Sequence, residues 1–264
     1  MNGSTADLLR RLPRPLLVGC GLALGLSLLL PWAFLRYHAF LAARAEASHA
    51  TRVASANQLA QQLTDRLQPG LDLLLRSARE PDVAAAMVQV DGAKRESLAV
   101  ELAKGVPGAL RVRMLKPDIA EPDETTRPPI SYVTLDQIRR ALADAQPALA
   151  ELHAIGTPDQ HLSIVQRIPP AGPPVGLLQL ALPASLLTDA LRTLPEGGLA
   201  AELRVPVAGG PMRIVAKTAE RRTGEGVLVQ VPVPRSSLSL ALVGPGGVLE
   251  GSDGGHDEFS FVPV

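Results

Sequence analysis

The stretch PLLVGCGLALGLSLLLPWAFL, residues 15–35, carries no charged side chain. As an α-helix its 21 residues would extend about 31 Å, which matches a bilayer hydrocarbon core about 30 Å thick. Trp32 and Tyr37 stand near its end, where amphipathic aromatic rings favour the membrane interface. The sequence therefore predicts one transmembrane helix over residues 15–36, with the lipid bilayer as its environment.

The charges before this stretch predict its orientation. Arg10, Arg11 and Arg14 precede it against a single acidic residue, Asp7. Because positively charged flanks stay on the cytoplasmic side, we expect residues 1–14 to form a cytoplasmic tail. The bulk of the chain would then lie on the other side of the membrane.

Two other interpretations of the apolar stretch fit its length and order less well. A cleaved signal peptide has a shorter apolar region, followed closely by small residues, whereas Ala42 and Ala43 lie well past this run. Residues 17–20 match a lipoprotein cleavage box, but the apolar run follows Cys20 instead of preceding it. We therefore interpret Cys20 and the glycines beside it as small residues on a membrane helix, where they can pack against a second helix.

The composition excludes several classes of function. Aromatic residues make up only 3% of the chain, and the 26 basic residues are balanced by 26 acidic ones. A nucleic-acid partner is not expected, because such proteins rely on aromatic stacking and a basic surface. Cys20 is the only cysteine, so an internal disulfide is excluded.

The residues after the apolar stretch predict a long stalk helix over residues 37–80, through which two copies of the chain could form a homodimer. Leucines recur at four-residue intervals, which is helical spacing: Leu59, Leu63 and Leu67. Pro69 and Gly70 are expected to interrupt this helix. Two short helices should follow, near residues 82–88 and 93–104.

A change of period marks an α+β domain over residues 81–245. Leu110, Val112 and Met114 alternate with arginines, as in a half-buried strand. Thr134 and Gln137 form a capping-box pattern that opens a helix with Leu135, Ile138 and Leu142 inward. Further helical and strand patterns follow, with a helix at 185–194 and strands at 152–156, 161–168, 175–182, 200–207, 212–217, 227–233 and 238–243. We predict an antiparallel sheet with helices packed on it, followed by a flexible tail at residues 246–264.

This order of elements resembles the extracytoplasmic Cache-type sensor domains of bacteria, whose sheets have PAS-like strand order. The chain also resembles the N-terminal membrane region of long bacterial phosphomannomutase/phosphoglucomutase proteins, in the segments PGALRVRML (107–115), PPISYVTLDQIRRA (128–141), GTPDQHLSIVQRI (156–168), VGLLQLALPASLL (175–187) and VPVPRSSLSLALVGP (231–245). The resemblance implies a single-pass protein of the bacterial inner membrane with a periplasmic C-terminal domain. It implies no mutase activity, because the family's T-A-S-H-N-P serine loop and D-G-D-x-D-R metal loop are both absent.

No catalytic constellation, cofactor motif or metal-ligand spacing stands out, so we expect no enzyme activity. Two histidines, His153 and His161, could share a metal only if their strands paired.

A small anionic ligand would be bound best by arginines, because the planar guanidinium can donate two parallel hydrogen bonds to a carboxylate. Our candidate binding residues are Arg111, Arg113, Tyr132 and Arg167. The alternative is that Arg111 and Arg113 lie on the solvent face of their strand.

The sequence thus favours a sensory or regulatory domain that signals across the membrane through another membrane or cytoplasmic protein. Two alternatives stay open: a structural subunit of an envelope assembly, such as a pilus or secretion complex, and the N-terminal part of a membrane-bound phosphomannomutase/phosphoglucomutase.

Overall fold

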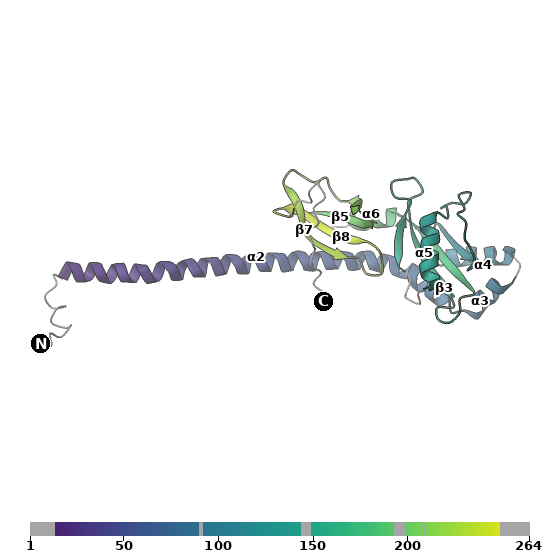
Figure 1. Cartoon of the computed structure of the whole chain (residues 1–264), viewed down its shortest axis with the longest axis horizontal. Helices are drawn as coiled ribbons and strands as arrows, with labels where there is room; N and C mark the ends of the chain where they lie inside the picture. Colours follow the sequence, from purple (N-terminus) through teal and green to yellow (C-terminus); the bar gives the residue numbers. More distant parts are fainter. Residues whose placement is uncertain (1–13, 90–91, 144–148, 193–198, 208–209, 249–264) are drawn as a thin grey trace. The chain divides into compact units, whose positions relative to one another are not determined.

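A computed structural model describes residues 14–89, 92–143, 149–192, 199–207 and 210–248 (Figure 1). Of residues 14–26 and 28 it describes the backbone alone. The chain divides into two compact units, Met1–Thr51 and Arg52–Val264. All strands, and all helices after the first, belong to the second unit.

The long helix predicted after the apolar stretch is present. Helix α2 spans Arg14–Ser77 without a break, so the predicted interruption at Pro69 and Gly70 is wrong. A proline inside a helix costs a backbone hydrogen bond. Here Leu67 and Leu71 on either side are almost fully buried, and their packing holds the helix together across Pro69.

The predicted transmembrane span is helical in its backbone, but its side chains at residues 15–26 and 28 lie outside the described part. Among the described residues, the structure holds no helix that is both long and apolar enough to cross a membrane. Residues 1–13 and 249–264, which contain most of the two predicted tails, are also outside the described residues.

The first sheet has four strands in the order β1-β4-β3-β2, and each neighbouring pair is antiparallel. Two short helices precede it in the chain, α3 (Pro81–Val88) and α4 (Gly92–Lys104). The strands are β1 (Arg111–Leu115), β2 (Ala150–His153), β3 (His161–Ile168) and β4 (Gly176–Pro183).

The second sheet also has four antiparallel strands, in the order β6-β5-β8-β7. Helix α6 (Ser185–Arg192) leads into it from the first sheet. Its strands are β5 (Ala200–Val207), β6 (Gly210–Lys217), β7 (Glu225–Pro232) and β8 (Ser239–Pro245). The predicted α+β class with antiparallel strands is therefore confirmed. The prediction of a single sheet is wrong, because β1–β4 pair among themselves and β5–β8 pair among themselves.

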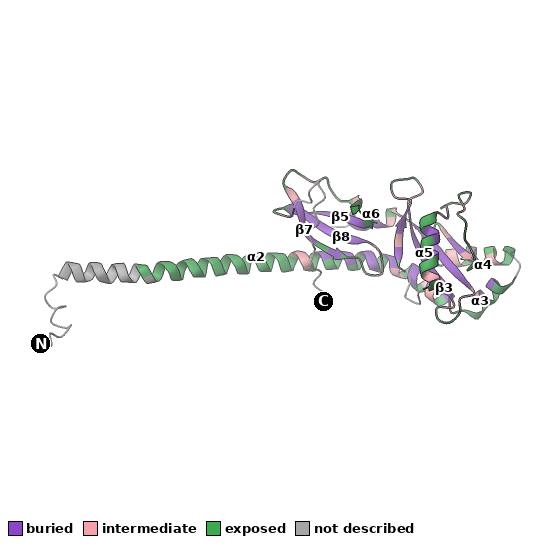
Figure 2. Ribbon diagram, viewed as in Figure 1, coloured by how far each residue is buried: buried purple, intermediate pink, exposed green. Residues whose placement is uncertain are grey.

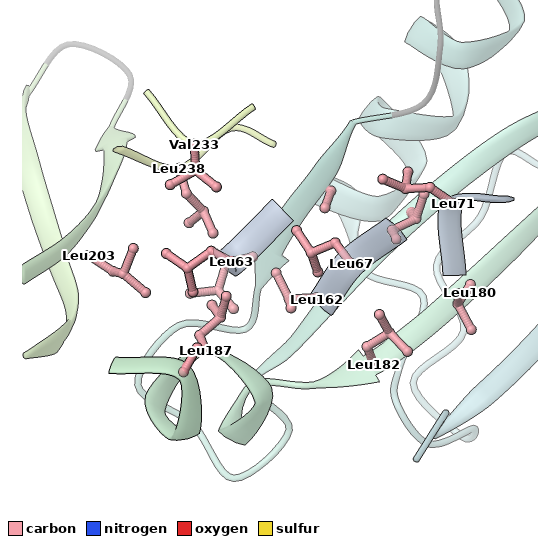
Figure 3. Packing of buried hydrophobic residues seen from close by; sticks show 14 of the residues in the cluster. Leu63, Leu67, Leu71, Leu162, Leu180, Leu182, Leu187, Leu203, Val233 and Leu238 are labelled. Atoms are coloured by element: carbon pink, nitrogen blue, oxygen red, sulfur yellow. The ribbon is translucent and has the colours of Figure 1, made fainter. Parts of the chain in front are cut away.

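One face of each sheet packs on the last turns of α2. Successive leucines of the helix are buried against leucines and isoleucines of the first sheet and against apolar residues of the second (Figure 3). The buried strands and the end of α2 form the purple region of Figure 2. The leucines of α2 in this core are Leu59, Leu63, Leu67, Leu71 and Leu74.

Packing explains why residue 70 is a glycine, because the first sheet comes very close to α2 at this residue. A Cβ atom built on Gly70 would lie 2.7 Å from Cδ2 of Leu180, which is fully buried. We expect Gly70→Val to lower the free energy of unfolding by about 1–3 kcal/mol, because a packed core tolerates added methyl groups poorly. Urea denaturation measures the change. An unfolding free energy equal to that of the wild type would show that the helix and sheet are not in contact here.

The opposite face of the first sheet is covered by α5 (Tyr132–Ala143), which crosses it in Figure 1. Leu135 and Ile138 are buried there against Val165 and Leu177, as the helical spacing of the two α5 residues predicts. The predicted capping box is wrong. The hydroxyl of Ser131 accepts the N–H of Thr134 at 3.3 Å, so the cap lies three residues before Thr134.

Candidate ligand-binding site

The face of the first sheet that α5 covers carries an unusual number of polar side chains. Because side chains alternate between faces along a strand, the register places Arg113 of β1 beside Gln179 of β4 on this face. Arg111 and Arg167 belong to the same face, two residues away along β1 and at the far end of β3. Three of the four predicted binding residues therefore share one sheet face.

Arg113 is a buried cation with neutral partners. Only 6% of its surface is exposed. Its guanidinium donates to Gln179 Oε1 at 3.2 Å, to Thr126 Oγ1 at 3.1 Å and to the carbonyl oxygen of Pro128. No carboxylate of the described residues forms an ion pair with it. Burial, aided by the charge of Arg111, lowers the pKa of Arg113 to about 10, although the carboxylates of Asp123 and Glu96 act in the other direction, so Arg113 stays charged at neutral pH. A buried charge is costly without a counter-charge, so this site favours an anion.

A hydrogen-bonded chain of neutral groups connects Arg113 to α5. Gln179 Nε2 donates to the hydroxyl of Ser163 at 3.2 Å, and that hydroxyl donates to Gln137 Oε1 at 2.8 Å. Gln137 Nε2 in turn donates to the backbone carbonyl oxygen of Ser163 at 3.0 Å. All three side chains are buried. Such a satisfied network fixes the positions of its members, so Arg113 is held in place instead of moving freely.

No local sequence pattern identifies all three of these side chains as members of one network. Two of them can be noticed, because each is a polar residue within an apolar strand. Gln179 interrupts the apolar run GLLQLALP and Ser163 interrupts HLSIV. A polar residue within an otherwise buried strand needs a partner. Gln137 also fits the spacing of a helix cap. The sequence therefore predicts a cap at this residue and not a hydrogen bond to the sheet.

The remaining predicted binding residues have other surroundings than Arg113. Arg111 is partly exposed and pairs with Glu96 at 3.1 Å. Arg167 is held by the carbonyl oxygens of Pro169, at 3.4 Å, and Gly172. Tyr132 begins α5 and is 73% exposed. Arg113 and Arg167 are both buried, 6% and 9% exposed, and neither forms an ion pair among the described residues. Arg113 is the more buried of the two, and its partners are side chains as well as a carbonyl oxygen, so it is our first candidate for binding an anion.

His153 and His161 lie directly opposite each other on β2 and β3, so the strand pairing that a shared site would need is present. Their ring centroids are 5.6 Å apart, and both rings are buried. No group of three or more histidine, cysteine, aspartate or glutamate side chains that could hold a metal ion occurs within the described ranges. The described residues therefore do not support a metal site at these two histidines.

The second sheet carries a buried cluster of charges. The carboxylate of Glu202 accepts hydrogen bonds from Arg204 at 2.7 and 3.1 Å and from Arg221 at 2.6 and 2.8 Å. Burial raises the pKa of the Glu202 carboxyl, but the two arginines outweigh it and hold the pKa below its usual value of 4.5. Since both arginines already have a carboxylate partner, the cluster is better suited to holding the sheet together than to binding a ligand.

Two solved structures share this fold. The ligand-binding domain of the Pseudomonas fluorescens chemoreceptor CtaA, solved with L-isoleucine, matches with a TM-score of 0.51 and 12% identity over 75% of this chain and 92% of that one. The ligand-binding domain of the Campylobacter jejuni chemoreceptor Tlp3, solved with L-valine, matches with a TM-score of 0.50 and 10% identity over 76% and 94%.

At these identities the likeness shows the fold alone: the α+β arrangement of this chain is also that of the two ligand-binding domains. No protein-family profile matches the sequence, and the comparison with curated proteins gives no relative. Neither of these two structures is a phosphomannomutase, so they give no support to the resemblance to that family.

Proposed function

We propose that the chain is a membrane-anchored extracytoplasmic sensory domain that binds a small carboxylate-bearing ligand on the α5 face of the first sheet. The observation that carries the proposal is Arg113, a buried guanidinium that donates to three neutral partners and forms no ion pair with a carboxylate of the described residues. A ligand carboxylate would supply the missing negative charge and form charge-assisted hydrogen bonds with it. The fold supports this function, since the CtaA and Tlp3 domains were solved in complex with amino acids.

The anchor is proposed on the uncharged run of residues 15–35 and the arginines before it. It would put the two sheets in the periplasm, beside a bacterial inner membrane. The chain would act by binding and not by catalysis, and would pass its signal to another membrane or cytoplasmic protein. Because α2 packs on both sheets, a ligand that shifts the first sheet would shift the helix that leads to the membrane.

A thermal-stability screen tests the proposal. The full chain, purified in detergent, is heated with each of the twenty amino acids and with acetate, pyruvate and succinate. We expect at least one compound to raise the midpoint of unfolding, since a ligand that binds only the folded state stabilises it. If every compound leaves the midpoint unchanged, the structural-subunit alternative replaces the sensory one.

The same screen with variants tests the role of Arg113. Arg113→Lys keeps the charge but loses the planar fork, so we expect the affinity for the stabilising compound to fall about tenfold or more. Arg111→Lys is the matched control on the same strand, where the arginine already has Glu96 as its partner. Equal affinities of the two variants would remove Arg113 from the binding site.

A further inference from the structure

The histidine pair on the first sheet has a property that ligand binding does not explain. Both rings are almost sealed from solvent, with 2% of His153 and 1% of His161 exposed. Each ring uses its Nδ1: that of His153 lies 3.1 Å from the hydroxyl of Thr134 on α5, and that of His161 lies 2.7 Å from the carbonyl oxygen of Asp159. Neither Nε2 atom has a hydrogen-bond partner among the described residues. His161 Nε2 is thus a buried ring nitrogen that has neither a hydrogen-bond partner nor an ion-pair partner among the described residues.

The charged groups around the two histidines do not favour a positive charge on the His161 ring. Arg113 of β1 and the neighbouring His153 both disfavour a proton on His161. Of the acids, Glu151 of β2 lies 3.7 Å from His153 Nε2 but is already paired with Arg140 of α5 at 2.8 Å, and Arg140 also pairs with Asp136. Asp159 lies 3.5 Å from Arg127. Glu151 is therefore near the His153 ring, whereas no acid among the described residues forms an ion pair with His161.

Strand β2 connects this pair to the second sheet. Its first residue, Ala150, donates its N–H to the carbonyl oxygen of Arg235 and accepts the N–H of Ser237, both at 3.0 Å. Its last residue is His153, which contacts α5 through Thr134. This four-residue strand is therefore hydrogen-bonded to β3, which carries His161, to α5 and to the loop before β8. A displacement of β2 would reach all three.

We propose that the His153–His161 pair is a proton-sensitive latch, which on acidification releases β2 and α5 and passes that movement to the second sheet. Charging the His161 ring creates a buried cation whose Nε2 has no acceptor among the described residues, so the two strands and the helix above them separate to let water or a carboxylate reach it. The latch does not depend on the ligand at Arg113, although it would loosen the helix that covers that ligand's face.

The direction of the pH dependence follows from His161. Burial lowers the pKa of its imidazole below the usual value of 6.5, because the charged ring loses its hydration. The unfolded chain therefore binds the proton more tightly than the folded protein does. The contribution of this residue to stability is complete above pH 6.5 and is lost as the pH falls below that value.

Hydrogen–deuterium exchange of the full chain in detergent at pH 7.5 and pH 5.5, corrected for intrinsic exchange rates, tests the latch. In the wild type we expect several-fold faster exchange at pH 5.5 in β2, in α5 and in residues 235–238, while β4 and β5 stay protected. In His161→Phe, which keeps a ring in the same space without a titrating nitrogen, this difference should disappear. His49→Phe, at an exposed histidine of α2, should behave as the wild type does.

Three outcomes would overturn the latch. One is equal protection of β2 and α5 at both pH values in the wild type. Another is the same acid response in His161→Phe as in the wild type. The third is acceleration spread evenly over both sheets, which would indicate general acid unfolding. Should His161→Phe fold poorly, His161→Gln is the second non-titrating variant, judged by the same comparison between the two pH values.

Discussion

Glu202→Ala is expected to lower the free energy of unfolding by about 3–5 kcal/mol, the usual cost of removing one member of a buried ion pair. The Glu202 side chain is fully buried and that of Arg204 is 1% exposed. The carboxylate accepts two hydrogen bonds from Arg204 and two from Arg221, so its loss leaves four donors without this acceptor. Urea denaturation at pH 7 measures the change.

The matched control for this variant is Glu220→Ala, which removes the same side chain from an exposed pair. Glu220 is 83% exposed and contacts Lys217 at 2.5 Å. Exposed pairs contribute about 0–1 kcal/mol, because water already solvates both charges. If Glu202→Ala and Glu220→Ala cost the same, the charge cluster does not hold the second sheet together.

Leu67→Ala should cost about 2–5 kcal/mol, the range found when a buried leucine is cut back to alanine and a cavity remains. Leu67 is fully buried on α2 beside Leu63, where the helix meets leucines of the first sheet, including Leu162 (Figure 3). The core of both sheets depends on this stretch of helix, so we expect unfolding to stay one cooperative transition at lower urea concentration.

Leu110→Ala is the control for the core variant, since Leu110 belongs to the same unit and is 49% exposed. Surface substitutions usually change stability by less than about 0.5 kcal/mol. A loss of stability in Leu67→Ala no greater than in Leu110→Ala would mean that α2 does not carry the core.

The elements of the fold are largely predictable from local patterns. The sequence predicts a strand over residues 161–168, and β3 is found at His161–Ile168. Apolar and β-branched residues bounded by turn residues are enough to define such a strand. The predicted helix interruption at Pro69 and Gly70 is wrong because local propensity for a break is weaker than the packing that the sheet supplies.

The site is harder to predict, because it depends on which strands pair and on what covers them. Arg113 looks like a solvent-facing residue of an alternating strand until α5 and the loop at residues 126–128 cover that face. Its partner Gln179 is 66 residues away in the chain. Only the order β1-β4-β3-β2 brings the two side chains together, and no local pattern specifies that order.

The most direct test of the sensory proposal maps where the ligand binds. Hydrogen–deuterium exchange of the full chain is measured with and without the compound that stabilises it most in the carboxylate and amino-acid screen. We predict slower exchange in β1, in the loop at residues 125–131 and in α5, and no such change in Arg113→Lys at the same concentration. Protection confined to the second sheet, or unchanged by Arg113→Lys, would contradict the proposal.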